Sequence, residues 1–150
     1  MDITLTAAKS PDIDTIIKFV QELYKHEDIR FNESLVMTAL SQLLQDDSLG
    51  YVWLIYYGEE AIGYVVLTFG YGLEFGGRDA LVDELYIREE YRGAGVGTKV
   101  LEFITEFCNS LGIKAIHLIV ERKNNKAHSL YRKMGFEDCD RDFMTKRIRF

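Results

Sequence analysis

The chain has 150 residues, of which 47% are hydrophobic and 28% charged, and its formal net charge is −6. This length fits one domain, and the apolar content argues against disorder. Residues 1–84 hold 5 Lys/Arg and 15 Asp/Glu, a balance of −10, whereas residues 85–150 hold 13 and 9, a balance of +4. This asymmetry favours a cationic ligand for the first part and an anionic ligand for the second, although ordinary surface variation would give the same counts.

Several classes of protein and site are disfavoured by what the sequence lacks. No apolar run approaches the roughly 20 residues of a membrane span, and no basic stripe with interleaved aromatic residues indicates nucleic-acid binding. Residues 1–7 lack the features of a signal peptide, so we expect a cytoplasmic protein. Cys108 and Cys139 have no histidine nearby at ligand spacing, so we expect no metal site. Cys108 instead fits the apolar face of a helix and is expected in the core.

The first part of the chain predicts a strand, two helices and three further strands. Alternating residues indicate the first strand, helical spacing of apolar residues indicates the helices, and β-rich runs indicate the other strands. The glycine-rich segment 70–79 is interpreted as a loop or a bulged hairpin extension. These elements are expected at residues 3–7, 11–24, 33–44, 51–57, 61–69 and 80–87.

The remainder predicts a glycine-rich turn, a long helix, a strand, a short helix and two closing strands. Gly112 and Gly135 each end the helix before them. The order β-α-α-β-β-β-α-β-α-β-β predicts an α/β layout with a mixed sheet. After the turn at 92–97, the elements are expected at residues 97–111, 115–120, 126–134, from 136 onward and at 143–149.

The glycine-rich turn between a strand and a helix N-terminus is typical of an anion site. Its backbone N–H groups point at the ligand, and the helix dipole favours negative charge. A P-loop needs Gly-Lys-Ser/Thr, whereas the order here is Gly97-Thr98-Lys99. A dinucleotide-binding fold needs G-x-G-x-x-G near the first strand, and this turn comes late in the chain. The third candidate ligand is the pyrophosphate of coenzyme A.

Two motifs resemble the GNAT superfamily of N-acetyltransferases. Arg92-x-x-Gly95-x-Gly97, after a strand ending Leu85-Tyr-Ile87, resembles the acetyl-CoA motif of that family. Asn124-x-x-Ala127-x-x-Leu130-Tyr131-x-Lys133-x-Gly135-Phe136 is similar to its downstream motif. The resemblance implies a single GNAT domain over residues 1–150, with helices on both faces of a mixed central sheet. It also implies an enzyme that moves an acetyl group from acetyl-CoA to a primary amine, and it suggests a homodimer.

The resemblance assigns roles to individual residues. Strand backbone groups and two residues of the downstream motif would line the pantetheine arm, and main-chain amides of the turn would hold the pyrophosphate. Tyr131 would lie near the thioester sulfur, where a phenol can donate a proton to the departing thiolate. The implied cofactor-binding residues are Leu85, Tyr86, Ile87, Arg92, Gly93, Ala94, Gly95, Val96, Gly97, Thr98, Asn124 and Ala127.

Acetyl transfer also needs a proton acceptor, because alkyl amines, like lysine with its pKa of about 10.4, are protonated at pH 7. Asp83 and Glu84 are adjacent on the strand before the turn, and strand alternation turns only one of them toward the cleft. The spacing resembles polyamine acetyltransferases, in which the position of Asp83 bears the active carboxylate, and Glu84 stays open as the alternative. Backbone donors beside Leu85–Ile87 would stabilise the oxyanion of a tetrahedral intermediate.

The segment Glu22-Leu-Tyr-Lys-His-Glu27 resembles the end of the first helix in spermidine/spermine N-acetyltransferases. That resemblance assigns His26 and Glu27 to substrate binding. Segment 70–79 differs from those enzymes, so the acceptor stays open between a small cationic amine, an aminoglycoside-like amine and a protein amino group. A second hypothesis is an acyl-CoA sensor without catalysis, and the presence of Tyr131 and of the 83–84 carboxylates favours the enzyme.

Overall fold

Five strands form one mixed sheet in the computed structural model, which describes residues 2–149. The strands lie side by side in chain order, and all neighbours are antiparallel except the last two, which are parallel. The predicted α/β class with a mixed sheet is confirmed. The strands are β1 (Ile3–Ala7), β2 (Gly50–Tyr57), β3 (Glu60–Gly72), β4 (Gly77–Ile87) and β5 (Ala115–Leu118).

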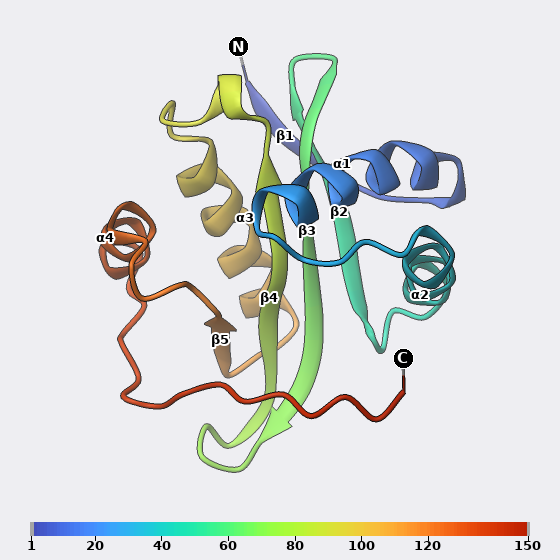
Figure 1. Ribbon diagram of the computed structural model, residues 1–150. Coiled ribbons are helices and arrows are strands. Elements are labelled where there is room, and N and C mark those ends of the chain that lie inside the picture. Colours follow the sequence, from blue (N-terminus) through green and yellow to red (C-terminus); the bar gives the residue numbers. More distant parts are fainter. Residues whose placement is uncertain (1, 150) are drawn as a thin grey trace. The chain divides into compact units, whose positions relative to one another are not determined.

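Helices cover both faces of this sheet (Figure 1). Helices α1 (Ile13–His26) and α2 (Glu33–Gln45) pack on one face, and α3 (Val96–Ser110) packs on the other. Strand alternation explains the two cores, because successive side chains point to opposite faces. In β2, Val52 packs beneath α1 whereas its neighbour Trp53 packs beneath α3. The predicted placement of helices on both faces is confirmed.

The glycine-rich segment 70–79 is a hairpin extension rather than a loop. Gly70 pairs with Asp79 and Gly72 pairs with Gly77, so β3 and β4 continue well beyond the body of the sheet. Of the two interpretations left open by the sequence, the hairpin is therefore the right one.

The pairing of β3 with β4 shifts by one residue at Asp83. Val66 pairs with Glu84 and Leu67 pairs with Val82, so Asp83 has no partner on β3. Such a β-bulge inserts one residue and reverses the alternation of the side chains that follow it. Val82 accordingly packs against α3, while Glu84 turns toward α1, where Tyr24 and Tyr64 contact it.

The chain divides into two compact units, the first ending at Ile119 and the second beginning at Val120. The second unit contains α4 (Asn125–Lys133) and an extended C-terminal segment. The strands predicted from residue 136 onward and at 143–149 are wrong, since residues 136–149 contain no strand. Eight of the 13 residues from 137 to 149 are charged, and charged residues are poor strand formers.

The core includes Cys108, which lies on the buried face of α3 and is 2% exposed, as its spacing predicted. Burial raises the pKa of its thiol to about 11. None of the helices in residues 2–149 is long and apolar enough to cross a membrane. The same residues contain no group of three or more His, Cys, Asp or Glu side chains arranged to hold a metal ion.

Replacing Gly63 by alanine is expected to destabilise the sheet beside β4. A Cβ atom at Gly63 would lie 1.9 Å from the backbone oxygen of Tyr86, so strand β4 itself would have to move. Overpacking of this kind costs about 1–3 kcal/mol. The matched control is Gly72→Ala in the same strand, where the nearest atom, 3.1 Å away, is a movable carboxylate oxygen of Asp79. Urea unfolding should show the larger loss for Gly63→Ala, and equal losses would contradict this close approach.

Candidate active site

The end of β4 has a free edge. Pairing of β4 with β5 stops at Val82 and Leu118, so residues 84–87 are paired with β3 on one side and, within the described chain, with no strand on the other. Figure 1 shows β5 beside only one end of β4. Backbone N–H and C=O groups along such an edge can bind an extended ligand as an added strand would. The bulge and the end of this pairing fall at adjacent residues.

Arg92 links the glycine-rich turn to this end of β4. Its Nε donates a 2.7 Å hydrogen bond to the carbonyl oxygen of Ile87, and its guanidinium lies 5.5 Å from the centroid of the Tyr86 ring. The Ile87 carbonyl, one of the backbone groups that the sequence assigned to cofactor binding, therefore already accepts an internal bond. Leu85 and Tyr86 lie on the free edge, and their role in cofactor binding stays a prediction.

The glycine-rich turn presents a row of unused amides at the start of α3. Gly93 and Gly95 have φ angles of 79° and 81°, and a Cβ atom on either would meet nothing within 4 Å. Gly95 is the N-cap residue of α3. From Gly93 to Thr98, no main-chain N–H donates to another described residue. Helix dipole, free amides and open space together form a site for an anion such as a phosphate.

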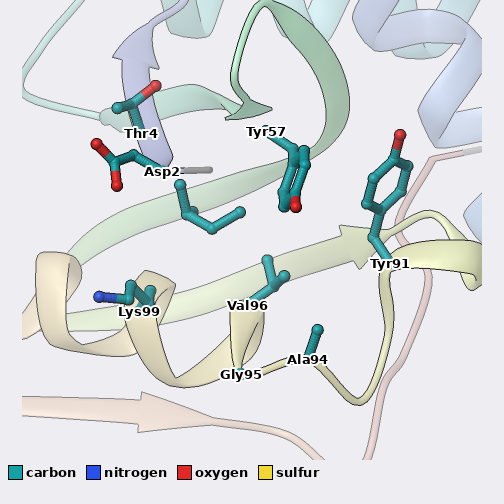
Figure 2. A pocket seen from close by; sticks show the side chains of 9 residues that line it. Asp2, Thr4, Tyr57, Tyr91, Ala94, Gly95, Val96 and Lys99 are labelled. Carbon is teal, nitrogen blue, oxygen red and sulfur yellow. The ribbon is translucent and has the colours of Figure 1, made fainter.

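A hollow of about 530 Å³ lies beside the turn, between β1, β2 and the first turn of α3 (Figure 2). Lys99, an exposed cation, belongs to its lining and lies near the free amides, which adds positive charge at this end of α3. Neither Asp83 nor Glu84 lines this hollow. Its lining residues are Asp2, Ile3, Thr4, Tyr57, Tyr91, Ala94, Gly95, Val96 and Lys99.

Glu84 is half-buried on the α1 face of the sheet between two tyrosines. The Tyr24 phenol donates to its Oε2 at 2.5 Å, and the Tyr64 phenol donates to its Oε1 at 2.7 Å. Burial raises the pKa of the Glu84 carboxyl, the two phenol bonds oppose that rise, and the charges of Asp83 and Glu27 add to it. Burial and the Glu84 charge also raise the pKa of both phenols, so they stay protonated donors.

Two more carboxylates lie near Glu84. Asp83 is exposed at the bulge, and desolvation by the surrounding chain still raises the pKa of its carboxyl. Glu27 directly follows α1, and its charge contributes to the raised pKa of Tyr24. None of Glu27, Asp83 and Glu84 pairs with a cation among the described residues. His26, which the sequence assigned to the same site, is exposed and has no polar contact with these carboxylates.

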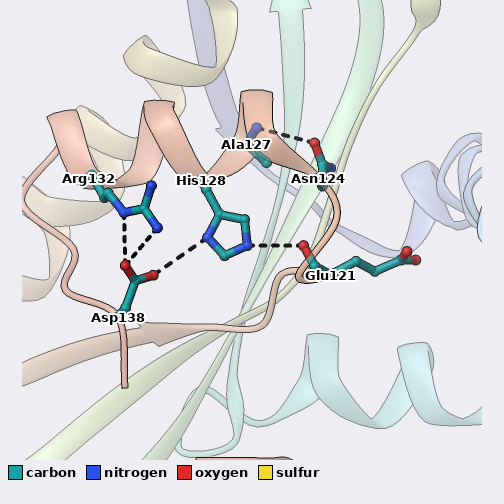
Figure 3. Close-up of polar contacts among 6 residues, drawn as sticks. All are labelled: Glu121, Asn124, Ala127, His128, Arg132 and Asp138. Carbon is teal, nitrogen blue, oxygen red and sulfur yellow. Dashed lines mark hydrogen bonds and ion pairs between the residues drawn. The ribbon is translucent and has the colours of Figure 1, made fainter. Parts of the chain in front are cut away.

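The second unit holds the downstream motif (Figure 3). Asn124 caps α4, because its side chain accepts a 3.2 Å bond from the Ala127 amide. Asp138 accepts from Arg132, which lowers the pKa of Asp138, and it pairs with His128. These contacts order the helix from both ends.

Tyr131 lies on α4 and packs edge-on against Phe136, with 6.0 Å between the ring centroids. The roles of Tyr131, Asn124 and Ala127 at a site shared with the first unit stay predictions.

Tyr24 and Tyr64 were missed by the sequence reasoning. Tyr64 faces Glu84 because the bulge at Asp83 reverses the side-chain alternation of β4, and no local pattern marks a bulge at that residue. Tyr24 carries a weak signal, since it follows the buried Leu23 in the last turn of an amphipathic helix that Glu27 directly follows. An aromatic residue at that place is ordinarily read as core packing.

Comparison with known proteins places residues 17–136 in one family model, described as the Acetyltransferase (GNAT) family. A thialysine N-epsilon-acetyltransferase from Bos taurus is 25% identical over 145 residues, covering 91% of this chain and 85% of that protein. Among solved structures, an integron cassette protein from the mobile metagenome of Cole Harbour Salt Marsh has a TM-score of 0.85 at 28% identity, covering 97% of this chain and 90% of that one. A predicted acetyltransferase with acetyl-CoA from Clostridium acetobutylicum has a TM-score of 0.80 at 18% identity, covering 97% and 96%.

Glu84→Gln is expected to gain stability relative to the parent as pH rises. The folded-state pKa of Glu84 is raised, so the stability contributed by its proton is full below the unfolded pKa and is lost as pH rises through the folded one. Glutamine does not titrate and can still accept a phenol bond. Urea unfolding between pH 4 and pH 8 should show the difference in free energy of unfolding moving in favour of Glu84→Gln.

The control for that series is Glu102→Gln, which removes an exposed carboxylate from α3. A Glu84→Gln difference that is flat with pH, or that moves in favour of the parent as pH rises, would contradict the raised pKa.

Proposed function

The chain belongs to the Acetyltransferase (GNAT) family and is an N-acetyltransferase, and we propose that it acetylates a small cationic primary amine with acetyl-CoA as donor. The observation that carries the choice of acceptor is the group of Glu27, Asp83 and Glu84, which has no internal cation and lies where α1 meets the end of β4. The thialysine ε-amine named for the bovine relative is a primary amine and supports the same class.

The donor's diphosphate is proposed to lie on the free amides of residues 93–98, with Lys99 nearby. The pantetheine arm would then follow the free edge of β4 at Leu85 and Tyr86, where backbone groups have no strand partner on the side away from β3. The likeness in fold to a structure with acetyl-CoA supports this choice of donor. Residues 1–150 are proposed to act as one catalytic domain, with Asn124 and Ala127 as further residues that bind the arm.

The reaction is direct transfer through a tetrahedral intermediate. A carboxylate of the Asp83–Glu84 pair removes a proton from the ammonium, and the neutral nitrogen attacks the thioester carbonyl carbon. Backbone N–H groups on the free edge of β4 stabilise the oxyanion. The C–S bond then breaks, and the Tyr131 phenol supplies a proton to the thiolate. The acetylated nitrogen releases its second proton to solvent, and solvent reprotonates the phenol. Raised carboxyl pKa values suit the first step, because a general base works best with a pKa near the operating pH.

A thiol-release assay with acetyl-CoA and a panel of amines tests this function. Diamines and other multiply charged amines should have the lowest KM, because three carboxylates that have no cationic partner in the described chain attract them. The preference over neutral and acidic acceptors should shrink between about 0.05 M and 0.5 M salt, since the Debye length falls over that range. Mass spectrometry of the product should show one added acetyl group on nitrogen. If acidic amines were the best acceptors and their rates did not depend on salt, the proposed cationic acceptor would be wrong. If thiol were released at the same rate without any amine, the proposed transfer to an amine would be wrong.

Gly95→Val should weaken acetyl-CoA binding about tenfold or more, because the side chain would enter the open space in front of the turn amides. Valine at a φ of 81° is also strained, so the matched control is Gly76→Val on the distal hairpin, where φ is 84° and the space is equally open. Calorimetry should show full affinity for the control. Equal affinities of the two variants for acetyl-CoA would show that the turn is not part of the cofactor site.

Tyr131→Phe should keep the fold and the affinity for acetyl-CoA while lowering kcat about 10²-fold, the low end of what a positioned acid contributes. The ring still packs on Phe136, and only the hydroxyl is lost. Tyr71→Phe, an exposed position on the hairpin, serves as the control. Single-turnover kinetics measure the chemical step, and an unchanged rate there would exclude Tyr131 as the proton donor.

A further inference from the structure

Glu84 has two donors, and they come from different elements. Tyr24 belongs to α1 and Tyr64 belongs to β3, and each donates to a different oxygen of the carboxylate. Tyr64 is fully buried and stacks with Phe19, so its phenol is fixed by the core. Tyr24 is half-buried and packs edge-on against Phe31. The carboxylate is therefore held from both sides by aromatic rings that are themselves packed.

Phenols that donate to both oxygens stabilise the carboxylate and not the carboxylic acid. A protonated Glu84 would present an O–H donor to one of the two phenols and would break the pattern. The charged and titratable groups around Glu84 are Tyr24 and Glu27 at the end of α1, Tyr64 on β3 and Asp83 beside it on β4. The two phenols are its only donors among the described residues, and no cation faces it.

Asp83, unlike Glu84, has no side-chain donor within residues 2–149 that fixes its carboxylate. It lies at the bulge next to the free edge of β4, it is exposed, and it makes no hydrogen bond or ion pair with any described residue. Nothing in the described chain orients it or fixes its charge. The two adjacent carboxylates therefore differ, since two phenols fix the position of Glu84, whereas the Asp83 side chain is exposed and free to accept a proton.

Resting on the proposed function, we propose that Tyr24 and Tyr64 are positioning residues that hold Glu84 as the anchor for the acceptor's ammonium and leave Asp83 as its proton acceptor. An ammonium has three N–H donors, and each oxygen of Glu84 keeps a lone pair beyond its phenol bond. One N–H of the acceptor binds Glu84, and another gives its proton to the Asp83 carboxylate. The freed nitrogen lone pair then attacks the thioester carbonyl carbon and forms the C–N bond, and the C–S bond breaks when the tetrahedral intermediate collapses. The Tyr131 phenol protonates the thiolate, the acetylated nitrogen releases its second proton to solvent, solvent reprotonates the phenol, and Asp83 returns its proton to solvent.

The test separates anchor from base by kinetics. Tyr24→Phe keeps the ring and removes one bond to Glu84, so KM for the amine should rise about tenfold while kcat stays within about twofold. Asp83→Asn should instead lower kcat about 10²-fold or more with little change in KM, and it should remove the acidic limb of the kcat profile. Tyr56→Phe is the matched control, because it removes a half-buried phenol on the same face that makes no hydrogen bond to Glu84. That control should leave both constants unchanged.

A second measurement needs no turnover. Carbon-13 NMR titration of the Glu84 carboxyl should show a higher pKa in Tyr24→Phe than in the parent, and no change in Tyr56→Phe. An unchanged Glu84 pKa in Tyr24→Phe, or a kcat loss there as large as that in Asp83→Asn, would overturn the assignment. A parent that turns over no amine would overturn the proposed function itself, and the titration would still report separately whether the phenol bonds oppose the rise in the Glu84 pKa.

Discussion

The one-residue bulge at Asp83 is the constraint on which the candidate site depends. It lies directly after Val82, where β4 loses its β5 partner, and it reverses the side-chain alternation of the rest of β4. Glu84 is thereby turned toward α1 and the two tyrosines, while the following backbone keeps one free edge. Regular pairing would have put Glu84 on the same face as Val82, beneath α3. A single inserted residue therefore turns an acidic group toward α1, directly beside the strand edge that β5 leaves unpaired.

The uneven charge of the sequence has a structural counterpart in the first unit. The carboxylates that lack a cation lie where α1 meets β4, whereas the free amides and Lys99 lie at the start of α3, on the other face of the sheet. The structure thus favours a cationic ligand near the carboxylates and an anionic ligand near the turn amides. In the sequence, the end of β4 lies between Glu84 and the turn. Arg92 ties the turn to that strand through its bond to Ile87.

Much of the fold could be predicted from the sequence because its signals are local. Helical spacing at Ile16, Val20 and Leu23 and the glycines of the turn each depend on neighbours within a few residues. The absence of strands after residue 136 could not be predicted. Phe143 and Ile148 suggest a strand, but they lie in a charged segment and pair with no strand of the described chain.

The residues of the candidate site were likewise predictable only where their signal is local in the sequence. Asp83, Glu84 and Gly95 are marked by motif and position, and the structure puts them at the end of β4 and the start of α3. Tyr24 and Tyr64 lie 60 and 20 positions from Glu84 in the sequence, and only the register of a bulged strand pair brings Tyr64 to it. His26 has no polar contact with these carboxylates among the described residues, so its role in substrate binding, which depends on a short resemblance, stays a prediction.

Amide hydrogen exchange with and without acetyl-CoA tests most directly whether the bulged end of β4 and the glycine turn form one cofactor site. Protection should appear together at the free edge of residues 84–87, where β5 gives no partner, and at residues 93–98, whose amides donate to no described residue. The distal hairpin at 70–77 should be unaffected. Protection confined to other segments, or absent from both at saturating acetyl-CoA, would contradict the site.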